Sequence, residues 1–90
     1  MQGPAGGVIL DIGCGPHKHA GAIGVDRRKM TGIDVVCDFN EGLPFRRDTV
    51  AGVYLHNIVE HMPDLIGFMV ELYRICQPGA KLYIRTPYYA

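Results

Sequence analysis

The amino-acid sequence predicts an α/β domain built on an open, mainly parallel β-sheet. Short apolar segments rich in Val and Ile recur along the 90 residues, and turn-forming residues separate them. One long helical pattern lies between the last two segments. Buried strands joined through a helix are typical of right-handed parallel crossovers, and they indicate an α/β sheet rather than a bundle or a sandwich.

Five segments are expected to form strands. Residues 1–7 precede them and are predicted to be a flexible lead-in, because they are rich in Gly and Pro. The domain itself is then expected to span residues 8–90. The predicted strands are Val8–Ile12, Ala22–Asp26, Asp34–Cys37, Val50–Leu55 and Lys81–Thr86.

The helical pattern runs from about Pro63 to Cys76. Pro63 suits the first helical turn, and Asp64 complements the positive end of the helix dipole. Gln77–Gly79 is expected to end the helix and turn the chain. The apolar face comprises Leu65, Phe68, Met69, Leu72, Ile75 and Cys76.

The connection between the first two strands is unusually short. Gly15 and Ala22 are only seven positions apart, whereas a parallel crossover normally needs a dozen residues or more. The first crossover helix is therefore expected to be reduced to about one turn or replaced by a loop.

Charge and cysteine content narrow the function classes. Nine basic and nine acidic residues cancel without a run of like charge, so nothing indicates a nucleic-acid or anionic-membrane surface. No apolar stretch approaches the roughly 20 residues of a spanning helix, and no signal-peptide pattern is present. The odd set Cys14, Cys37 and Cys76 fits a reducing compartment, and a cytoplasmic location is expected.

A glycine turn follows the first strand. In Gly13-Cys14-Gly15 the glycines allow a sharp turn and a close approach of a ligand to the backbone. A dinucleotide-binding fingerprint would need a third glycine where Lys18 stands, so a nicotinamide or flavin site loses its main support. A purely structural turn is the alternative.

Two carboxylates end the next strands. Asp26 could accept hydrogen bonds from both hydroxyls of a ribose, or it could be a solvated strand end beside two arginines. Asp38 could accept a hydrogen bond from an exocyclic amine, and Phe39 could cover a base. Phe39 and Phe45 could also be ordinary core aromatics, which is the preferred interpretation for Phe45. Together these residues indicate a site for a nucleoside-bearing cofactor.

The histidines are the weakest candidates for a catalytic role. His56 and His61 follow the fourth strand and could carry protons, but a capping or surface role suits each equally well. No metal site is predicted, because the spacing of the remaining possible ligands matches no standard zinc pattern. Those ligands are Cys14, His17, His19 and Cys37.

Taken together, these motifs resemble the class I S-adenosylmethionine-dependent methyltransferases, especially the small-molecule group often labelled methyltransferase type 11. The resemblance implies a Rossmann-like sheet of about five strands in the order 3-2-1-4-5. It also implies methyl transfer from S-adenosyl-L-methionine, with S-adenosyl-L-homocysteine as product. The matching stretches, in the family's order, are VILDIGCG (Val8–Gly15), GVDR (Gly24–Arg27), DFNEGLPF (Asp38–Phe45), VYLHNIVEH (Val53–His61) and ELYRICQPGAKLYIRTP (Glu71–Pro87).

The resemblance assigns roles to individual residues. At the nucleoside end, Asp26 would hold the ribose hydroxyls, Arg27 would lie beside the adenine, Asp38 would meet its amine and Phe39 would flank the ring. His61 matches the family's Glu-His pair, whose role varies. At the methionine end, the loop and strand residues would be Asp11, Gly13, Cys14 and Gly15, with Leu55 and His56 near the sulfonium.

The sequence departs from the family after the fifth predicted strand. The family's sheet continues with two further strands and covering helices, so we expect a truncated, cofactor-binding part with an exposed edge at Lys81–Thr86. A partner or a second copy would cover that edge, and Tyr88 and Tyr89 would lie near it or near the acceptor. The methyl acceptor, a small molecule or another group, is not identified. The alternative function is a non-catalytic cofactor-binding or interaction module that needs a partner chain.

Overall fold

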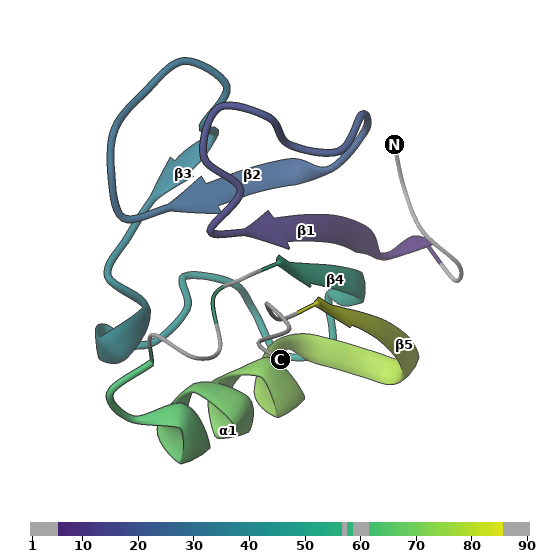
Figure 1. Cartoon of the computed structure of the whole chain (residues 1–90). Coiled ribbons are helices and arrows are strands. Elements are labelled where there is room, and N and C mark those ends of the chain that lie inside the picture. Colours follow the sequence, from purple (N-terminus) through teal and green to yellow (C-terminus); the bar gives the residue numbers. More distant parts are fainter. Residues whose placement is uncertain (1–5, 57, 59–61, 86–90) are drawn as a thin grey trace, which may run out of the picture.

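The computed structural model describes residues 6–56, 58 and 62–85. These residues form a five-stranded sheet with an α-helix on one face (Figure 1). The sheet has the order β3-β2-β1-β4-β5, and every neighbouring pair is parallel, which confirms the predicted topology. The elements are β1 (Val8–Ile12), β2 (Ile23–Asp26), β3 (Val35–Val36), β4 (Val50–His56), α1 (Leu65–Ile75) and β5 (Cys76–Arg85).

Predicted and observed strand bounds agree most closely at the centre of the sheet. β1 has the predicted limits, β2 begins one residue later than expected, and β4 extends one residue further to His56. At the edges the differences are larger, because β3 is reduced to two residues and β5 begins at Cys76. Of the expected features, residues 1–5 of the lead-in, His61, Thr86, Tyr88 and Tyr89 lie outside the described residues.

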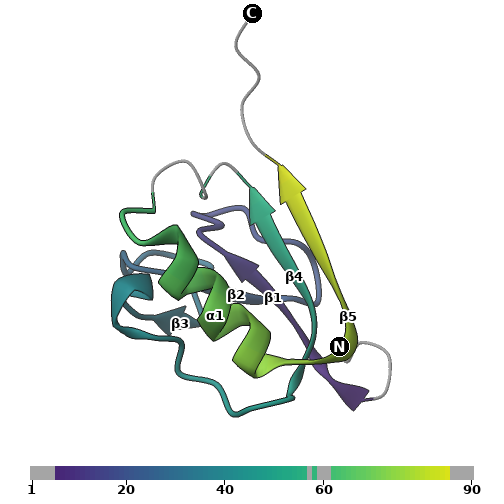
Figure 2. The same ribbon diagram turned by 90° about the horizontal axis from the view of Figure 1, so that it is seen from below.

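α1 closes the main hydrophobic core. The register of β1 and β4 sets Leu10 opposite Val53 and Ile12 opposite Leu55, so these four side chains share one face of the sheet. The helix lies across that face in Figure 2 and buries Phe68, Leu72 and Ile75. Burying each such side chain stabilises the fold by roughly 1.5–3 kcal/mol.

The beginning of α1 differs from the prediction. The helix starts at Leu65, and Asp64 is its N-cap, whose carboxylate accepts the backbone N–H of Gly67 at 2.9 Å. Pro63 therefore precedes the cap and is not in the first helical turn. Leu65 is 42% exposed, so the apolar face that the sequence predicts begins in practice at Phe68.

The end of α1 also corrects a prediction. The helix ends at Ile75 and Cys76 is already extended, so Gln77–Gly79 does not form a separate turn after the helix but lies within β5. Val50 pairs with Cys76 while Gly52 pairs with Lys81, so the surplus residues of β5 bulge out of the ladder. Gly79, with φ of 83°, adopts the left-handed conformation that this bulge requires.

The opposite face of the sheet carries no helix among the described residues. Between β1 and β2 a loop of residues 13–22 replaces the first crossover helix, as the short spacing predicts. The loop packs closely on β2, because a Cβ at Gly24 would lie 3.1 Å from Cδ of Lys18 and 3.2 Å from Sγ of Cys14. No helix in the described part of the chain has the length and apolar character needed to cross a membrane.

Candidate functional site

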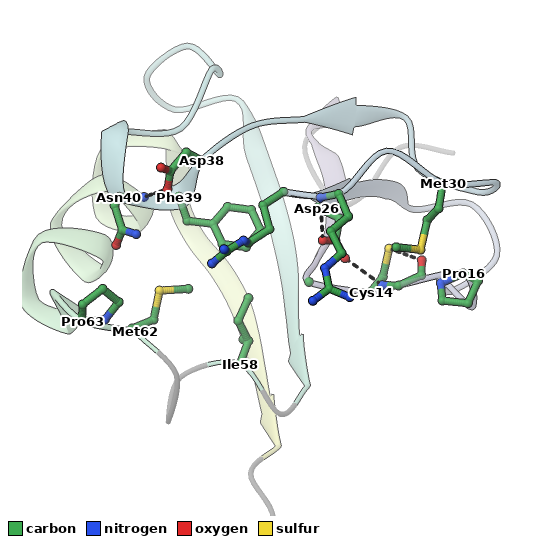
Figure 3. Close-up of a pocket in the computed structure, with 14 residues that line it drawn as sticks. Cys14, Pro16, Asp26, Met30, Asp38, Phe39, Asn40, Ile58, Met62 and Pro63 are labelled. Carbon is green, nitrogen blue, oxygen red and sulfur yellow. Dashed lines mark hydrogen bonds between the residues drawn. The ribbon is translucent and has the colours of Figure 1, made fainter.

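A cavity of about 840 Å³ opens at the carboxyl ends of β1 and β2 (Figure 3). In open parallel sheets, ligands bind in the crevice at this end of the strands. The volume lies within the range of roughly 300–1,000 Å³ that small-molecule sites occupy. The lining residues are Gly13, Cys14, Gly15, Pro16, Asp26, Arg27, Arg28, Met30, Asp38, Phe39, Asn40, Ile58, Met62 and Pro63.

Most of the residues predicted to bind a cofactor meet in this cavity. Those that line it are Gly13, Cys14, Gly15, Asp26, Arg27, Asp38 and Phe39. Leu55 does not line it, because its side chain is fully buried in the core beneath α1. Asp11 and His56 do not line it either, and both belong to a separate polar cluster on the face opposite α1. His61 is outside the described residues.

The two glycines of the turn have different surroundings. Both have left-handed backbone conformations, with φ of 71° at Gly13 and 60° at Gly15. A Cβ at Gly13 would lie 2.5 Å from Cδ1 of Ile58, whereas a Cβ at Gly15 would meet nothing within 4 Å. Gly13 thus lets the segment after β4 approach the turn, and Gly15 leaves open space beside the cavity.

Asp26 ties the two loops of the site together. Its Oδ2 accepts the N–H of Gly15 at 3.0 Å and its Oδ1 accepts the N–H of Arg28 at 3.1 Å. The residue is only 9% exposed, so these bonds fix the carboxylate at the wall of the cavity. Each carboxylate oxygen can accept more than one hydrogen bond, and Asp26 therefore retains capacity for two ligand hydroxyls.

Cys14 is a neutral thiol in this site. Burial, followed by the negative charges of Asp11 and Asp26, raises the pKa of the thiol above its ordinary value. The thiol donates a hydrogen bond to the carbonyl oxygen of Gly15 at 3.2 Å. Because the thiolate is the nucleophilic form, Cys14 is protected from reaction with an electrophilic ligand in the cavity.

The far wall of the cavity is formed by Asp38 and by the first two residues of a 3₁₀ turn at Phe39–Glu41. Asp38 caps this turn by accepting the N–H of Asn40 at 2.9 Å. Phe39 is nearly buried and its ring lies 6.2 Å from that of Phe68, so it is a core aromatic and a cavity wall at once. Phe45 packs against the core, as expected for an ordinary core aromatic.

Ile58, Met62 and Asn40 also line the cavity, and sequence reasoning did not assign them to the site. In Figure 3 the side chains of Ile58 and Met62 extend toward the ring of Phe39. The sequence could have indicated that the segment with Ile58 and Met62 lines the site, because a segment that follows a central strand lies at the crevice. Apolar side chains at that position, however, look like any other core residues in the sequence.

Two charged residues of α1, Glu71 and Arg74, hold the loop that follows the 3₁₀ turn behind the cavity, and we call this pair the clasp. Glu71 Oε1 accepts the N–H of Leu43 at 2.8 Å, and Glu71 also pairs with Arg74 in the same helix. Arg74 in turn donates to the carbonyl oxygens of Leu43 and Phe45. The bond from Arg74, then that from Leu43, lowers the pKa of Glu71 from 4.5 to about 2. The i, i+3 spacing of an acid and a base on the predicted helix could have indicated this pair.

The charges of the site are balanced. Two carboxylates, Asp26 and Asp38, and two guanidinium groups, Arg27 and Arg28, line the same cavity. Such a site suits a ligand that carries several hydroxyl and amine groups without a large net charge. The described residues contain no group of three or more His, Cys, Asp and Glu side chains that could hold a metal ion.

Comparisons with known proteins identify the relatives of this chain. The family described as "Methyltransferase domain" matches residues 2–90. The chain is 27% identical to 24-methylenesterol C-methyltransferase 2 of Arabidopsis thaliana over 104 residues, covering 89% of this chain and 29% of that protein. It is 32% identical to cycloartenol-C-24-methyltransferase 1 of Oryza sativa subsp. japonica over 60 residues, covering 62% of this chain and 17% of that protein. No solved structure matches the chain.

Proposed function

The chain belongs to the methyltransferase domain family, and on this premise we propose that its cavity binds S-adenosyl-L-methionine for methyl transfer. The observation that carries the proposal is the convergence of Asp26, Asp38 and the Gly13–Gly15 turn on one cavity. Three separate strand ends supply these groups, and a purely structural glycine turn would not require both carboxylates beside it.

The residues of the cavity suit this cofactor. Asp26 would hold the ribose hydroxyls through the lone pairs that Gly15 and Arg28 leave free. Asp38 and Phe39 would hold the adenine, and the open space beside Gly15 would receive the methionine part. A protonated Cys14 would not compete with the acceptor for the methyl group.

When bound, S-adenosyl-L-methionine supplies a methyl group whose carbon forms a bond to the acceptor while the electrons of the C–S bond stay on sulfur. The protein's contribution is mainly to align acceptor and cofactor, because oriented reactants avoid a large entropic cost. The clasp of Glu71 and Arg74 would serve this alignment by fixing the loop behind Phe39.

The matched relatives are named as sterol methyltransferases, and the chain spans 29% and 17% of their lengths. These names support methyl transfer as the class of reaction and do not identify the acceptor of this chain. The alternative function is a cofactor-binding module that transfers no methyl group without a partner chain. It is favoured by the sheet face opposite α1, which carries no helix in the described part of the chain.

Isothermal titration calorimetry with S-adenosyl-L-methionine and S-adenosyl-L-homocysteine tests the proposal. We expect one binding site, and we expect Asp26→Ala to weaken binding by about 1.5–3 kcal/mol, on the order of 10- to 100-fold in Kd. Asp26→Asn, which keeps the shape of the side chain, should also weaken binding. Glu41→Gln is the matched control, since Glu41 is an exposed carboxylate outside the cavity.

Three results would contradict these assignments. Folded protein that binds neither ligand excludes the proposed function. Preferential binding of a nicotinamide dinucleotide favours an oxidoreductase instead. Unchanged cofactor affinity in Asp26→Ala would mean that Asp26 has only a structural role in joining the two loops. Turnover with a panel of acceptors then separates an active methyltransferase from a binding module.

A further inference from the structure

A second cluster of titratable and aromatic side chains lies outside the cavity. The sheet register places Asp11 beside Tyr54 and Tyr54 beside Tyr83, so these residues form one row on the face opposite α1. His19, from the loop that replaces the first crossover helix, lies on this row, and His56 at the end of β4 completes the cluster. None of the five lines the cofactor cavity.

Asp11 fixes the orientation of His19. A single carboxylate oxygen, Oδ2, accepts the backbone N–H of His19 at 2.8 Å and contacts its Nδ1 at 2.8 Å. An ionised carboxylate can only accept hydrogen bonds, so Nδ1 carries a proton in this contact. The Nε2 atom of the neutral ring is then the one with a free lone pair.

The pair combines a buried orienting group with an accessible ring. Asp11 is 3% exposed, whereas the side chain of His19 is 40% exposed. The imidazole stacks on Tyr54 with ring centroids 3.7 Å apart and an interplanar angle of 6°. Tyr54 stacks in turn on Tyr83, and His56 meets both His19 and Tyr54 edge-on. The ring is therefore held in one plane and one tautomer.

The cluster meets the cavity at the ends of two central strands. Asp11 is on β1, two residues before Gly13 in the turn that follows this strand. His56 is the last residue of β4, two residues before Ile58. Gly13 and Ile58 both line the cavity and approach each other closely. The cluster therefore borders the cavity at the carboxyl edge of the sheet.

We propose that Asp11 and His19 form a proton-accepting pair for a methyl acceptor that reaches the cofactor from the face opposite α1. This inference rests on the proposed function. It indicates an acceptor whose attacking atom bears a proton, such as a phenol, an amine or a thiol. The acceptor's proton moves to Nε2 of His19 and gives an imidazolium ion paired with the carboxylate of Asp11. That proton then leaves to water. His19 is the base, and Asp11 positions it.

Carbethoxylation of the free protein by diethyl pyrocarbonate tests the pair without cofactor or acceptor. The reagent modifies the unprotonated nitrogen of a histidine, and trypsin cleaves after Lys18, so His17 and His19 appear in separate peptides in mass spectrometry. His17 is the internal control, because it is an exposed histidine in the same loop. We expect His19 to react several-fold faster than His17 at the limiting rate reached at high pH. We expect Asp11→Asn to remove the difference.

Two outcomes of this experiment would overturn the proposal. A His19 that reacts no faster than His17 is not an accessible, activated base. A His19 whose rate is unchanged in Asp11→Asn, in protein shown by circular dichroism to be folded, is not oriented by that carboxylate. Neither outcome depends on cofactor binding, so failure of the proposed function and failure of the pair are distinguishable.

Cofactor affinity separates a base from a cofactor ligand. We expect His19→Gln to bind S-adenosyl-L-homocysteine as wild type does. In transfer to a phenol we expect it to lower kcat by roughly 100-fold or more, which is the usual contribution of a general base. A large loss of S-adenosyl-L-homocysteine affinity in His19→Gln would assign the pair to cofactor binding, and a wild-type kcat would remove it from the reaction.

Discussion

Gly13 and Gly15 have similar backbone angles, but they differ in the space that their surroundings leave for a side chain. Alanine at either position must adopt a left-handed conformation, which costs about 1–2 kcal/mol. At Gly13 the new methyl group would also collide with Ile58, whereas the space beside Gly15 is open. We expect Gly15→Ala to destabilise the fold by about 1–2 kcal/mol and Gly13→Ala by about 2–4 kcal/mol. Chemical denaturation measures both.

A double-mutant cycle checks the cause at Gly13. If the collision with Ile58 is responsible, Ile58→Ala should relieve part of the cost of Gly13→Ala, with a coupling energy of about 1 kcal/mol. Additive effects of the two substitutions would show that the cost arises from the backbone alone. Gly15→Ala combined with Ile58→Ala should be additive and serves as the matched control.

For single residues, the sequence predicts the position of side chains at strand ends better than the position of side chains that loops bring together. Asp26 and Asp38 follow apolar runs, and parallel strands deliver such residues to one edge of the sheet. The contact between Asp11 and His19 depends on the path of an irregular loop across the sheet, which no periodicity encodes. The resemblance to methyltransferases places Asp11 at the cofactor, and the sequence alone offers His19 only as a possible metal ligand.

At the scale of elements, α1 and the loop after the 3₁₀ turn are joined by the carboxylate of Glu71. Since the pKa of Glu71 is lowered from 4.5 to about 2, the ionised carboxylate stabilises the folded state. This contribution is fully present above the ordinary pKa of a glutamate. It is lost as the pH falls from near 5 toward 2, where Glu71 becomes protonated in the folded protein as well. Glu71→Gln cannot ionise, so its stability should lack this dependence.

Urea denaturation at a series of pH values measures this contribution. We expect wild type to be more stable than Glu71→Gln near pH 6 and the difference to shrink steadily toward pH 2. The variant Glu41→Gln removes an exposed acid from the same region and controls for net charge. A constant difference between wild type and Glu71→Gln would mean that the clasp acts through packing and not through its charge.

The sequence predicted the existence of each element more securely than its ends. Helical spacing identified α1, because Phe68, Leu72 and Ile75 recur on one face and are buried. The end of the helix was harder to predict, since Gln77–Gly79 has the composition of a turn. In the structure, pairing with β4 draws these residues into β5, and the bulge absorbs the surplus length. Long-range strand pairing thus overrode the local preference for a turn.

At the scale of the whole molecule, β5 is an edge strand that pairs only with β4 among the described residues. Leu82, Tyr83 and Ile84 on this strand are 39–51% exposed. A long edge with apolar side chains is a template for pairing with another chain. We expect the protein to self-associate as its concentration rises and Ile84→Lys to suppress that association, as measured by sedimentation velocity.

Ile66→Lys is the matched control for the edge. Ile66 is 79% exposed on α1, so the substitution Ile66→Lys introduces the same charge at an exposed isoleucine away from the edge strand. Equal suppression by both variants would point to net charge or to the helix surface, and an effect of Ile84→Lys alone would point to β5. A chain that stays monomeric at all concentrations would contradict the expectation.

The topology of the whole sheet could be predicted because it depends on few facts. Apolar runs without alternation indicated parallel strands, and the resemblance to methyltransferases supplied their order. The second, polar cluster could not be predicted, since Tyr54 and Tyr83 become neighbours only through the register of β4 and β5. Register follows from the packing of the whole face, and single residues do not reveal it.

The loop that replaces the first crossover helix also has a consequence for how the chain folds. Pairing β1 with β2 closes only residues 13–22, whereas pairing β1 with β4 must close residues 13–49. Because the entropic cost of closure rises by roughly 0.6 kcal/mol for each doubling of loop length, the shorter closure is favoured by about 1 kcal/mol. Pairing β2 with β3 closes residues 27–34, which is similarly short, so the strands that carry the glycine turn and Asp26 are among the earliest partners available to an unfolded chain. By the same reasoning β5, which pairs with β4 across residues 57–75, would join β4 early, and the pairing of β1 with β4 would come last.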